Sequence, residues 1–305
     1  MKAVRIHQYG GPEVLSLDDA AQPEPGAGQV LVRIRAAGVN PADWKIREGQ
    51  FKEFLPLQFP AILGFDFAGE VVTSGPGASG FKQGDPVYGT AMGTYAEFVA
   101  ARMEEVALKP ASMSYVEAAS VPVAGQTAWQ ALFDVGGLGA GKRVLIHGAT
   151  GGVGSFAVQL AKARGVSVIG TGSERNQEYL RELGVDEPID YKKTKFEDVA
   201  RDVDVVFDTQ GGETQQRSWQ VLKKGGVLVS IVQQPSEEEA ARYGVKGVFL
   251  GRQPSTEQLV EIAKLADAGK FKTKVDTVLP LSEARRAQEL SQSGHARGKI
   301  VLTVA

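Results

Sequence analysis

The chain has 305 residues, of which 43% are hydrophobic and 23% charged, and its formal net charge is −2 at pH 7. That length suits two domains better than one core, and the weak charge gives no broad attraction to nucleic acid or to anionic membranes. Cysteine is absent, which excludes disulfides, thiolate nucleophiles and Cys-ligated metal centres. The three histidines, His7, His147 and His295, are far apart in sequence, so we expect no metal site.

The first third of the chain reads as short strands separated by turns. Residues 30–36 alternate between apolar and polar side chains, as a half-buried strand does. Further short strands are expected at 60–64, 69–72, 85–89 and 95–99. Frequent turns between short strands are typical of a compact, barrel-like β unit.

The chain carries no targeting or membrane signal that we recognise. Its first residues, 1–6, are charged and lead into a polar turn, which is unlike a signal peptide. No apolar run approaches the roughly 20 residues needed to cross a bilayer. We therefore expect a cytoplasmic protein with no membrane partner and no nucleic-acid partner.

From about residue 122 strands and helices alternate, which predicts a parallel, doubly wound sheet. The expected strands are 144–146, 166–171, 185–190, 203–208, 226–232 and 247–250, and the expected helices are 127–134, 153–161, 177–183, 214–222 and 256–267. After Gly269 strand character returns, ending in a strand at 299–304. We expect that tail to pack on the first unit, which gives domains at 1–121, 122–268 and 269–305.

The stretch 144–154 is the most informative part of the chain. An apolar strand runs into GATGGVG at 148–154, and a helix follows. Such a turn binds anions, because unpaired backbone N–H groups and the helix dipole face outward and missing Cβ atoms let a pyrophosphate approach. The next strand, 166–171, arrives where a βαβ unit needs it. The sequence predicts a dinucleotide site here, and the alternative is a merely structural turn.

The residues after the second strand of that unit bear on which nucleotide is bound. NAD-binding units place an acidic residue there, for the ribose 2′-hydroxyl, but Thr171 and Gly172 carry no carboxylate. The guanidinium of Arg175 suits a phosphate, and Ser173 offers one more donor. Glu174 fits such a site only if it points to solvent. We expect NADP; the alternative is that Ser173 caps a helix and Arg175 is a solvated charge.

Several segments in this order are similar to the medium-chain dehydrogenase/reductase superfamily, above all to its zinc-independent quinone oxidoreductase and enoyl-reductase branch. They are AAGVNPADWK at 36–45, LGFDFAGEVV at 63–72, GQTA at 125–128, IDY at 189–191 and GHARGK at 294–299. The resemblance covers essentially the whole chain. It implies a Rossmann-type doubly wound parallel sheet inserted into a GroES-like, mostly-β barrel domain. It also implies a homodimer in which a strand near 247–250 pairs across a twofold axis.

Carried over residue by residue, the resemblance implies a set of NADPH-binding positions. It assigns Thr150, Gly151, Gly152 and Val153 to the pyrophosphate, Ser173, Arg175 and Tyr191 to the 2′-phosphate, and Thr127 and Asn40 to the neighbourhood of the nicotinamide. Thr209, Ser230 and Ile231 end strands at the edge of the sheet where cofactors lie in such folds. Lys299 would reach back toward the cofactor.

The chain departs from the alcohol-dehydrogenase branch at the positions that hold catalytic zinc. Asn40 stands where that branch has its first Cys ligand, and Phe65 stands where it has a His. Phe cannot bind a metal and no Cys can replace it. The resemblance therefore implies an enzyme without zinc and excludes a zinc alcohol dehydrogenase.

Without a metal, the substrate must itself be electrophilic enough to accept a hydride from NADPH, as quinones and α,β-unsaturated carbonyls are. Tyr191 and Lys195 match the Tyr-x-x-x-Lys spacing of short-chain reductases. That pair must lie on a helix beside the nicotinamide, whereas Tyr191 follows a strand beside the adenosine half. We interpret the match as a coincidence.

The pocket candidates lie in the segment 40–47. Asn40 could orient the carboxamide or a substrate oxygen, Trp44 could form an apolar wall, and Lys45 could polarise a carbonyl. For Lys45, and for Arg47 beside it, a solvated loop cation is an equal interpretation, and Asp43 is a candidate structural cap. None has the signature of an obligatory general acid, so we expect water to protonate the product.

These inferences predict a zinc-independent, NADPH-dependent oxidoreductase that reduces small-molecule quinones or enones. Two alternatives stay open. One is an enoyl-thioester reductase, which would need a long acyl channel. The other is a non-catalytic NADPH-binding protein with a structural, sensory or RNA-binding role. NADPH oxidation across quinones and enals separates the catalytic from the non-catalytic hypothesis.

Overall fold

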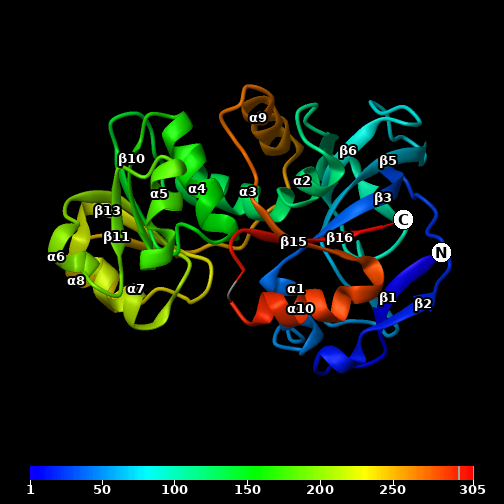
Figure 1. The fold of residues 1–305 in the computed structure, drawn as a ribbon, viewed down its shortest axis with the longest axis horizontal. Helices are drawn as coiled ribbons and strands as arrows, with labels where there is room; N and C mark the ends of the chain where they lie inside the picture. Colours follow the sequence, from blue (N-terminus) through cyan, green and yellow to red (C-terminus); the bar gives the residue numbers. More distant parts are fainter. Residues whose placement is uncertain (295, 305) are drawn as a thin grey trace. The chain divides into compact units, whose positions relative to one another are not determined.

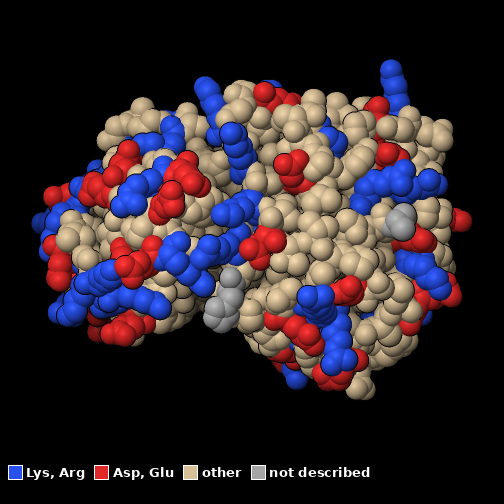
Figure 2. Space-filling view, in the orientation of Figure 1, with Lys and Arg blue, Asp and Glu red and all other residues tan. Residues whose placement is uncertain are grey.

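The computed structural model describes residues 1–294 and 296–304, so His295, one of the histidines considered above, lies outside the described residues. The chain folds into two compact units. Unit 1 comprises 1–123 and 254–305, and unit 2 comprises 124–253. None of the described helices is long and apolar enough to cross a bilayer. On the face drawn in Figure 2, basic and acidic side chains are interspersed.

Unit 2 is built on a parallel sheet with the strand order β11-β10-β9-β12-β13-β14 (Figure 1). Its strands are β9 (Arg143–Ile146), β10 (Ser167–Gly172), β11 (Glu187–Asp190), β12 (Val203–Asp208), β13 (Leu222–Ser230) and β14 (Lys246–Phe249). The order is that of a doubly wound dinucleotide-binding sheet, whose direction of winding reverses between β9 and β12. The expected doubly wound parallel sheet is therefore confirmed.

The helices of unit 2 connect these strands. They are α3 (Pro122–Trp129), which continues as a π-helix (Gln130–Val135), α4 (Gly152–Ala163), α5 (Gln177–Glu182), α6 (Phe196–Val199), α7 (Gly212–Ser218) and α8 (Glu237–Tyr243), with 3₁₀ turns at Glu174–Asn176 and Trp219–Val221. Strand residues such as Leu145, Ile169 and Val206 are buried in the core, as the apolar runs of a parallel sheet require. Helix α8 was not expected from its polar sequence; Ser236 caps its start and Gly244, at φ 66°, ends it.

Unit 1 is mostly β structure, as expected. One sheet has the order β2-β1-β4 and the other β15-β16-β3-β5-β6-β8, with β7 also paired to β3. The strands are β1 (Lys2–Ile6), β2 (Ser16–Asp19), β3 (Gln29–Val39), β4 (Ala61–Ile62), β5 (Asp66–Ser74), β6 (Pro86–Thr90), β7 (Phe98–Arg102), β8 (Val106–Leu108), β15 (Val275–Pro280) and β16 (Lys299–Thr303). The C-terminal strand β16 lies antiparallel to β3, so the tail of the chain completes a sheet that the first third of the chain begins (Figure 1).

Short helices complete unit 1, and two of them differ from expectation. They are α1 (Pro41–Arg47), α2 (Tyr115–Ala119), α9 (Thr256–Asp267) and α10 (Ala284–Gln292), with 3₁₀ turns at Pro12–Val14, Met103–Glu105 and Leu281–Glu283. No helix was expected at 41–47, but Pro41 at the first helical position favours one. The tail after Gly269 was expected as strand, yet α10 buries Ala284 and Ala287.

The boundary between the nucleotide-binding domain and the tail was predicted at residue 268, and the structure corrects it. Unit 2 ends at Gln253, so α9 belongs to unit 1. The physical reason is that α9 packs on the β strands of unit 1. The hydroxyl of Tyr88 on β6 donates a hydrogen bond to the backbone oxygen of Leu259 at 2.5 Å. The alternation of strands and helices in the sequence could not show whether this helix packs on unit 1 or on unit 2.

Candidate functional site

In unit 2 the turn between β9 and α4 forms a tight backbone cradle. The backbone N–H of Gly148 donates to the Thr171 hydroxyl at 3.1 Å, and that of Ala149 donates to the Thr171 carbonyl at 3.0 Å. A Cβ on Gly154 would lie 2.2 Å from the Gly148 oxygen, so α4 approaches the turn as closely as only glycine allows. The first N–H groups of α4, at Gly152 and Val153, have no acceptor within the helix. The cradle therefore fits a pyrophosphate.

The other expected cofactor positions in unit 2 lie at the carboxyl ends of strands. Thr209 follows β12 and donates to the His147 oxygen at 2.7 Å. Ser230 ends β13 and donates to buried Asp208 at 2.8 Å, while the N–H of Ile231 donates to the Asp208 oxygen at 3.2 Å. Thr150 accepts a hydrogen bond from Asn176 at 3.3 Å. Side chains and backbone at this edge are thus held by internal hydrogen bonds.

The expected 2′-phosphate residues gather at the end of β10. Ser173 is the N-cap residue of the 3₁₀ turn that carries Arg175. The N–H of Tyr191 donates to the Gly172 oxygen at 3.3 Å, which holds Tyr191 beside this strand end. Glu174 is exposed and forms an ion pair with Lys193. Its charge therefore points to solvent and is partly neutralised, the condition under which it fits a phosphate site.

Two further residues considered in the sequence analysis, Thr127 and His147, are buried in unit 2. Thr127 lies on α3 and is 7% exposed. His147 is fully enclosed: its Nε2 lies 2.8 Å from the Ser218 hydroxyl, and burial lowers its pKa to about 4. A neutral, enclosed imidazole of this kind is structural. In unit 1, His7 pairs instead with Asp18 at 2.8 Å.

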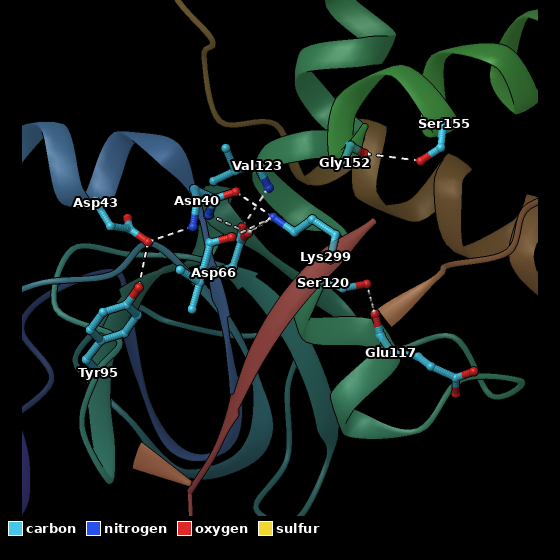
Figure 3. Close-up of polar contacts among 11 residues, drawn as sticks. Asn40, Asp43, Asp66, Tyr95, Glu117, Ser120, Val123, Gly152, Ser155 and Lys299 are labelled. Atoms are coloured by element: carbon cyan, nitrogen blue, oxygen red, sulfur yellow. Dashed lines mark hydrogen bonds and ion pairs between the residues drawn. The ribbon is translucent and has the colours of Figure 1, made fainter. Parts of the chain in front are cut away.

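In unit 1 a cluster of buried polar side chains surrounds Asn40, which is 4% exposed (Figure 3). Its amide nitrogen Nδ2 donates to Asp66 Oδ2 at 2.8 Å, and its Oδ1 accepts from Lys299 Nζ at 2.5 Å. The ammonium of Lys299 also donates to the Val39 oxygen at 3.3 Å and lies 3.5 Å from Asp66 Oδ2. Asp66 Oδ1 accepts from the backbone N–H of Val123 at 2.7 Å. Chain segments far apart in sequence thus meet at one amide.

Asp43 lies on the other side of Asn40 and has a structural role. Its Oδ2 accepts from the backbone N–H of Asn40 at 2.8 Å and from the Tyr95 hydroxyl at 2.7 Å. The side chain is completely buried, and burial raises its pKa from 3.8 to about 7. Oδ1 has no hydrogen-bond partner among the described residues. A carboxyl enclosed in this way caps the start of α1.

The remaining pocket candidates lie on α1. Trp44 and Lys45 are both partly exposed, and the Lys45 ammonium is 5.6 Å from the centroid of the Trp44 ring. Arg47 is different, because its side chain has no exposed area. It donates to the Gly10 oxygen at 3.1 Å and to Gln288 on α10 at 2.8 Å. The interpretation of Arg47 as a solvated loop cation is therefore wrong.

Sequence reasoning missed three residues, of which Asp66 and Tyr95 belong to this cluster and Lys193 pairs with Glu174 in unit 2. Asp66 directly follows Phe65, so the zinc comparison pointed to its position without assigning it a role. Lys193 belongs to the Tyr-x-x-x-Lys segment, which the structure places in a turn after β11 rather than on one helix. Tyr95 had no signal in the sequence, since only folding brings it to Asp43.

Comparisons with known proteins agree with this architecture. The family model for the alcohol dehydrogenase GroES-like domain matches residues 26–111, and that for zinc-binding dehydrogenase matches residues 183–302. A chloroplast envelope quinone oxidoreductase homolog of Arabidopsis thaliana is 35% identical, over 99% of this chain and 98% of its own. The structure of the quinone oxidoreductase from Coxiella burnetii superposes with a TM-score of 0.90 at 37% identity, over 100% and 99% of the two chains.

The chain belongs to the medium-chain dehydrogenase/reductase superfamily. Within it, the chain falls in the zinc-independent quinone oxidoreductase branch. The Escherichia coli quinone oxidoreductase complexed with NADPH is also similar, with a TM-score of 0.90 at 28% identity over 100% of both chains. These findings confirm the family and the Rossmann-type and GroES-like fold that the sequence motifs predicted.

One matching family model describes zinc-binding dehydrogenases, so we tested whether the residues fit a metal. At the positions that the sequence comparison aligns with zinc ligands, Asn40 is bonded to Lys299 and Asp66, and Phe65 has no ligand atom. In the part of the chain that the structure describes, no group of three or more His, Cys, Asp or Glu residues could hold a metal ion. These residues do not fit a catalytic zinc.

Proposed function

We propose that this protein is a metal-independent, NADPH-dependent reductase of quinones and α,β-unsaturated carbonyls. The observation that carries the proposal is the cluster around Asn40, in which the side chain at the expected ligand position binds the Lys299 ammonium beside Asp66. An enzyme with such a site has no Lewis acid to activate an alcohol. It therefore suits acceptors that are already electrophilic.

The cofactor proposal rests on unit 2. The backbone cradle of 148–154 suits a pyrophosphate, and Ser173, Arg175 and Tyr191 lie together at the end of β10 without a strand-end carboxylate. An arginine fork beside a hydroxyl recognises phosphate better than a ribose hydroxyl. Structures of two relatives contain NADPH, which supports the same assignment. Bound NADPH would supply the hydride.

The substrate proposal rests on unit 1. Asp43 is enclosed and Asn40 is held by its neighbours, so neither can serve as a general acid that reaches into solvent. Lys45 is the accessible cation of this segment, beside the face of the Trp44 indole. Its ammonium can donate a hydrogen bond to a carbonyl oxygen while the indole contacts an apolar ring. Water then protonates the product, because the described side chains Asn40 and Asp43 are enclosed.

The names of relatives refer to both kinds of acceptor, quinones and α,β-unsaturated carbonyls. One is 2-methylene-furan-3-one reductase of Solanum lycopersicum, 37% identical over 99% of this chain and 79% of its own. Others are named quinone oxidoreductase homologs. A second candidate function is enoyl-thioester reduction, which the likeness to the CurK enoyl reductase favours, with a TM-score of 0.90 at 26% identity.

The proposal includes a homodimer and a cytoplasmic location. Strand β14 is at the edge of its sheet and leaves backbone groups to pair with a second copy. Phe249 on this strand is 46% exposed. Light scattering of wild type and of Phe249→Asp tests the dimer. We expect a dimeric wild type and a monomeric variant, and a monomeric wild type would contradict the proposal.

The proposed cytoplasmic location needs its own test, because several relatives are named as chloroplast or mitochondrial proteins. Imaging of a tagged chain provides that test.

The activity is tested by NADPH oxidation across a panel of quinones, enones, enoyl thioesters and secondary alcohols, with and without chelator. We expect turnover of quinones or enones, little turnover of alcohols, and no effect of the chelator. Preference for enoyl thioesters would favour the second candidate function. No turnover of any acceptor by a protein that binds NADPH would favour a non-catalytic role. One zinc per chain by elemental analysis would contradict the metal-free mechanism.

A further inference from the structure

The cluster around Asn40 contains a feature that the proposed reaction does not yet use, a buried lysine. Lys299, the first residue of β16, is 4% exposed. Lysine is almost never enclosed unless its charge is paired and hydrogen-bonded. Here Nζ donates to Asn40 Oδ1 and to the Val39 oxygen, and Asp66 Oδ2 lies 3.5 Å away. The acceptor oxygens and the carboxylate around this ammonium therefore stabilise its positive charge.

These contacts fix the orientation of the Asn40 amide. Asp66 is a pure acceptor when ionised and Lys299 is a pure donor. The amide satisfies both only with Nδ2 toward Asp66 and Oδ1 toward Lys299, as observed. A flipped amide would place its N–H groups against the ammonium and its oxygen against the carboxylate. Lys299 and Asp66 together therefore select one of the two orientations of Asn40.

The locked amide keeps capacity for one more partner on each atom. An amide nitrogen carries two N–H groups and an amide oxygen accepts two hydrogen bonds. Asp66 takes one N–H and Lys299 takes one acceptor site, which leaves one of each. An amide whose oxygen faces a cation and whose nitrogen faces an anion is also more polarised than a free amide. Asn40 is thus a rigid and polarised hydrogen-bonding group.

We propose that Lys299 is an internal cation that takes the place of a metal in this cluster and positions Asn40 for the proposed reaction. The departure from the alcohol-dehydrogenase branch supports it: Asn40 stands where the resemblance puts the first zinc ligand of that branch, yet its oxygen binds an ammonium of the same chain. Because the cation is supplied by β16, the C-terminal strand completes the site that α1 begins. Lys299 is a positioning residue, and the proposal rests on the proposed function.

The test is chemical rescue of Lys299→Ala by small amines, with Lys270→Ala as the matched control because Lys270 is an exposed lysine of the same unit. We expect Lys299→Ala to lose kcat by about tenfold or more, since misplacing a positioning group by about 1 Å can cost on the order of a hundredfold. Methylammonium should restore kcat in a saturable way. Tetramethylammonium, which has no N–H to donate, should not.

A second readout does not depend on turnover. Methylammonium should raise the Tm of Lys299→Ala while leaving wild type and Lys270→Ala unchanged. Lys299→Met, which keeps most of the side-chain volume and leaves no room for an amine, should lose kcat without rescue. This neutral variant also tests the proposal if the alanine variant does not fold.

The outcomes separate this proposal from the proposed function. Wild-type kcat in Lys299→Met or Lys299→Ala would overturn the positioning role, as would equal rescue by tetramethylammonium or an amine-independent Tm. A wild-type protein without turnover on any acceptor would instead overturn the proposed function. In that case the amine-dependent Tm alone decides whether Lys299 is the cluster's internal cation.

Discussion

Replacing Asp43 by Asn tests the description of the buried cluster through the pH dependence of stability. Burial raises the pKa of folded Asp43 from 3.8 to about 7. Between these values the folded chain keeps a proton on Asp43 that the unfolded chain has released. Stability from this group is therefore fully present below pH 3.8 and is lost as pH rises through about 7.

The size of the effect follows from that interval. Each pH unit between the two pKa values lowers the free energy of unfolding by about 1.4 kcal/mol. From pH 5 to pH 8, Asp43 alone accounts for about 3 kcal/mol, because the decline stops near pH 7. Asn cannot ionise, and its oxygen can accept the same hydrogen bonds from the Asn40 backbone and from Tyr95.

The assay is urea unfolding of wild type, Asp43→Asn and Asp276→Asn at several pH values between 5 and 8. Asp276 is exposed and serves as the control. Burying an amide in place of the carboxyl changes the free energy of unfolding by the same amount at every pH. That change does not affect the comparison, because only the pH dependence is compared. We expect wild type and the control to lose stability toward pH 8 and Asp43→Asn to lose about 3 kcal/mol less. An unchanged pH dependence in Asp43→Asn would refute the reasoning.

Three further substitutions test other parts of the molecule. Arg175→Ala should weaken NADPH binding about tenfold or more and leave NADH binding nearly unchanged, because a charge-assisted contact to the 2′-phosphate is lost; equal losses in titrations with both cofactors would contradict the assignment. Gly154→Ala should weaken NADPH binding and lower Tm, since its Cβ would lie 2.2 Å from the Gly148 oxygen, whereas Gly139→Ala adds a Cβ in open space; similar melting curves for the two would count against the cradle. Arg47→Met should lower the free energy of unfolding by about 3 kcal/mol, because it leaves buried acceptors unpaired; denaturant unfolding that detects no loss would mean that the arginine is not enclosed.

The local part of the fold could be predicted from the sequence because it depends on short-range patterns. The strand at Val203–Asp208 and the helix at Thr256–Asp267 have the bounds that periodicity gave. The turn at 148–154 could be recognised because its glycines, the strand before it and the helix after it are contiguous. Periodicity says which segments are helices or strands, but not which unit they pack on, and α9 was assigned to the wrong one for that reason.

The cluster in unit 1 could be predicted only in part, because its contacts are long-range. Asn40 was singled out from a motif, but the partner of its oxygen, Lys299, is 259 residues away. For Arg47 a solvated cation stayed an equal interpretation, because its partner Gln288 is 241 residues away on α10, a helix whose polar sequence resembled no core element. A charged or amide side chain can be recognised as a buried hydrogen-bonding residue only when the folded structure shows which groups it contacts.

The measurement that tests the central claim most directly is product analysis with deuterated NADPH. We predict that an enone substrate receives one deuterium on its β-carbon, or that a quinone is reduced to its hydroquinone, in protein freed of metal by chelation. The described residues include no cluster that could hold a metal ion, so the proposed enzyme offers mainly orientation, worth roughly 7–11 kcal/mol in favourable cases, which suffices only for a reactive acceptor. Oxidation of secondary alcohols with NADP⁺ at comparable rates would contradict the account.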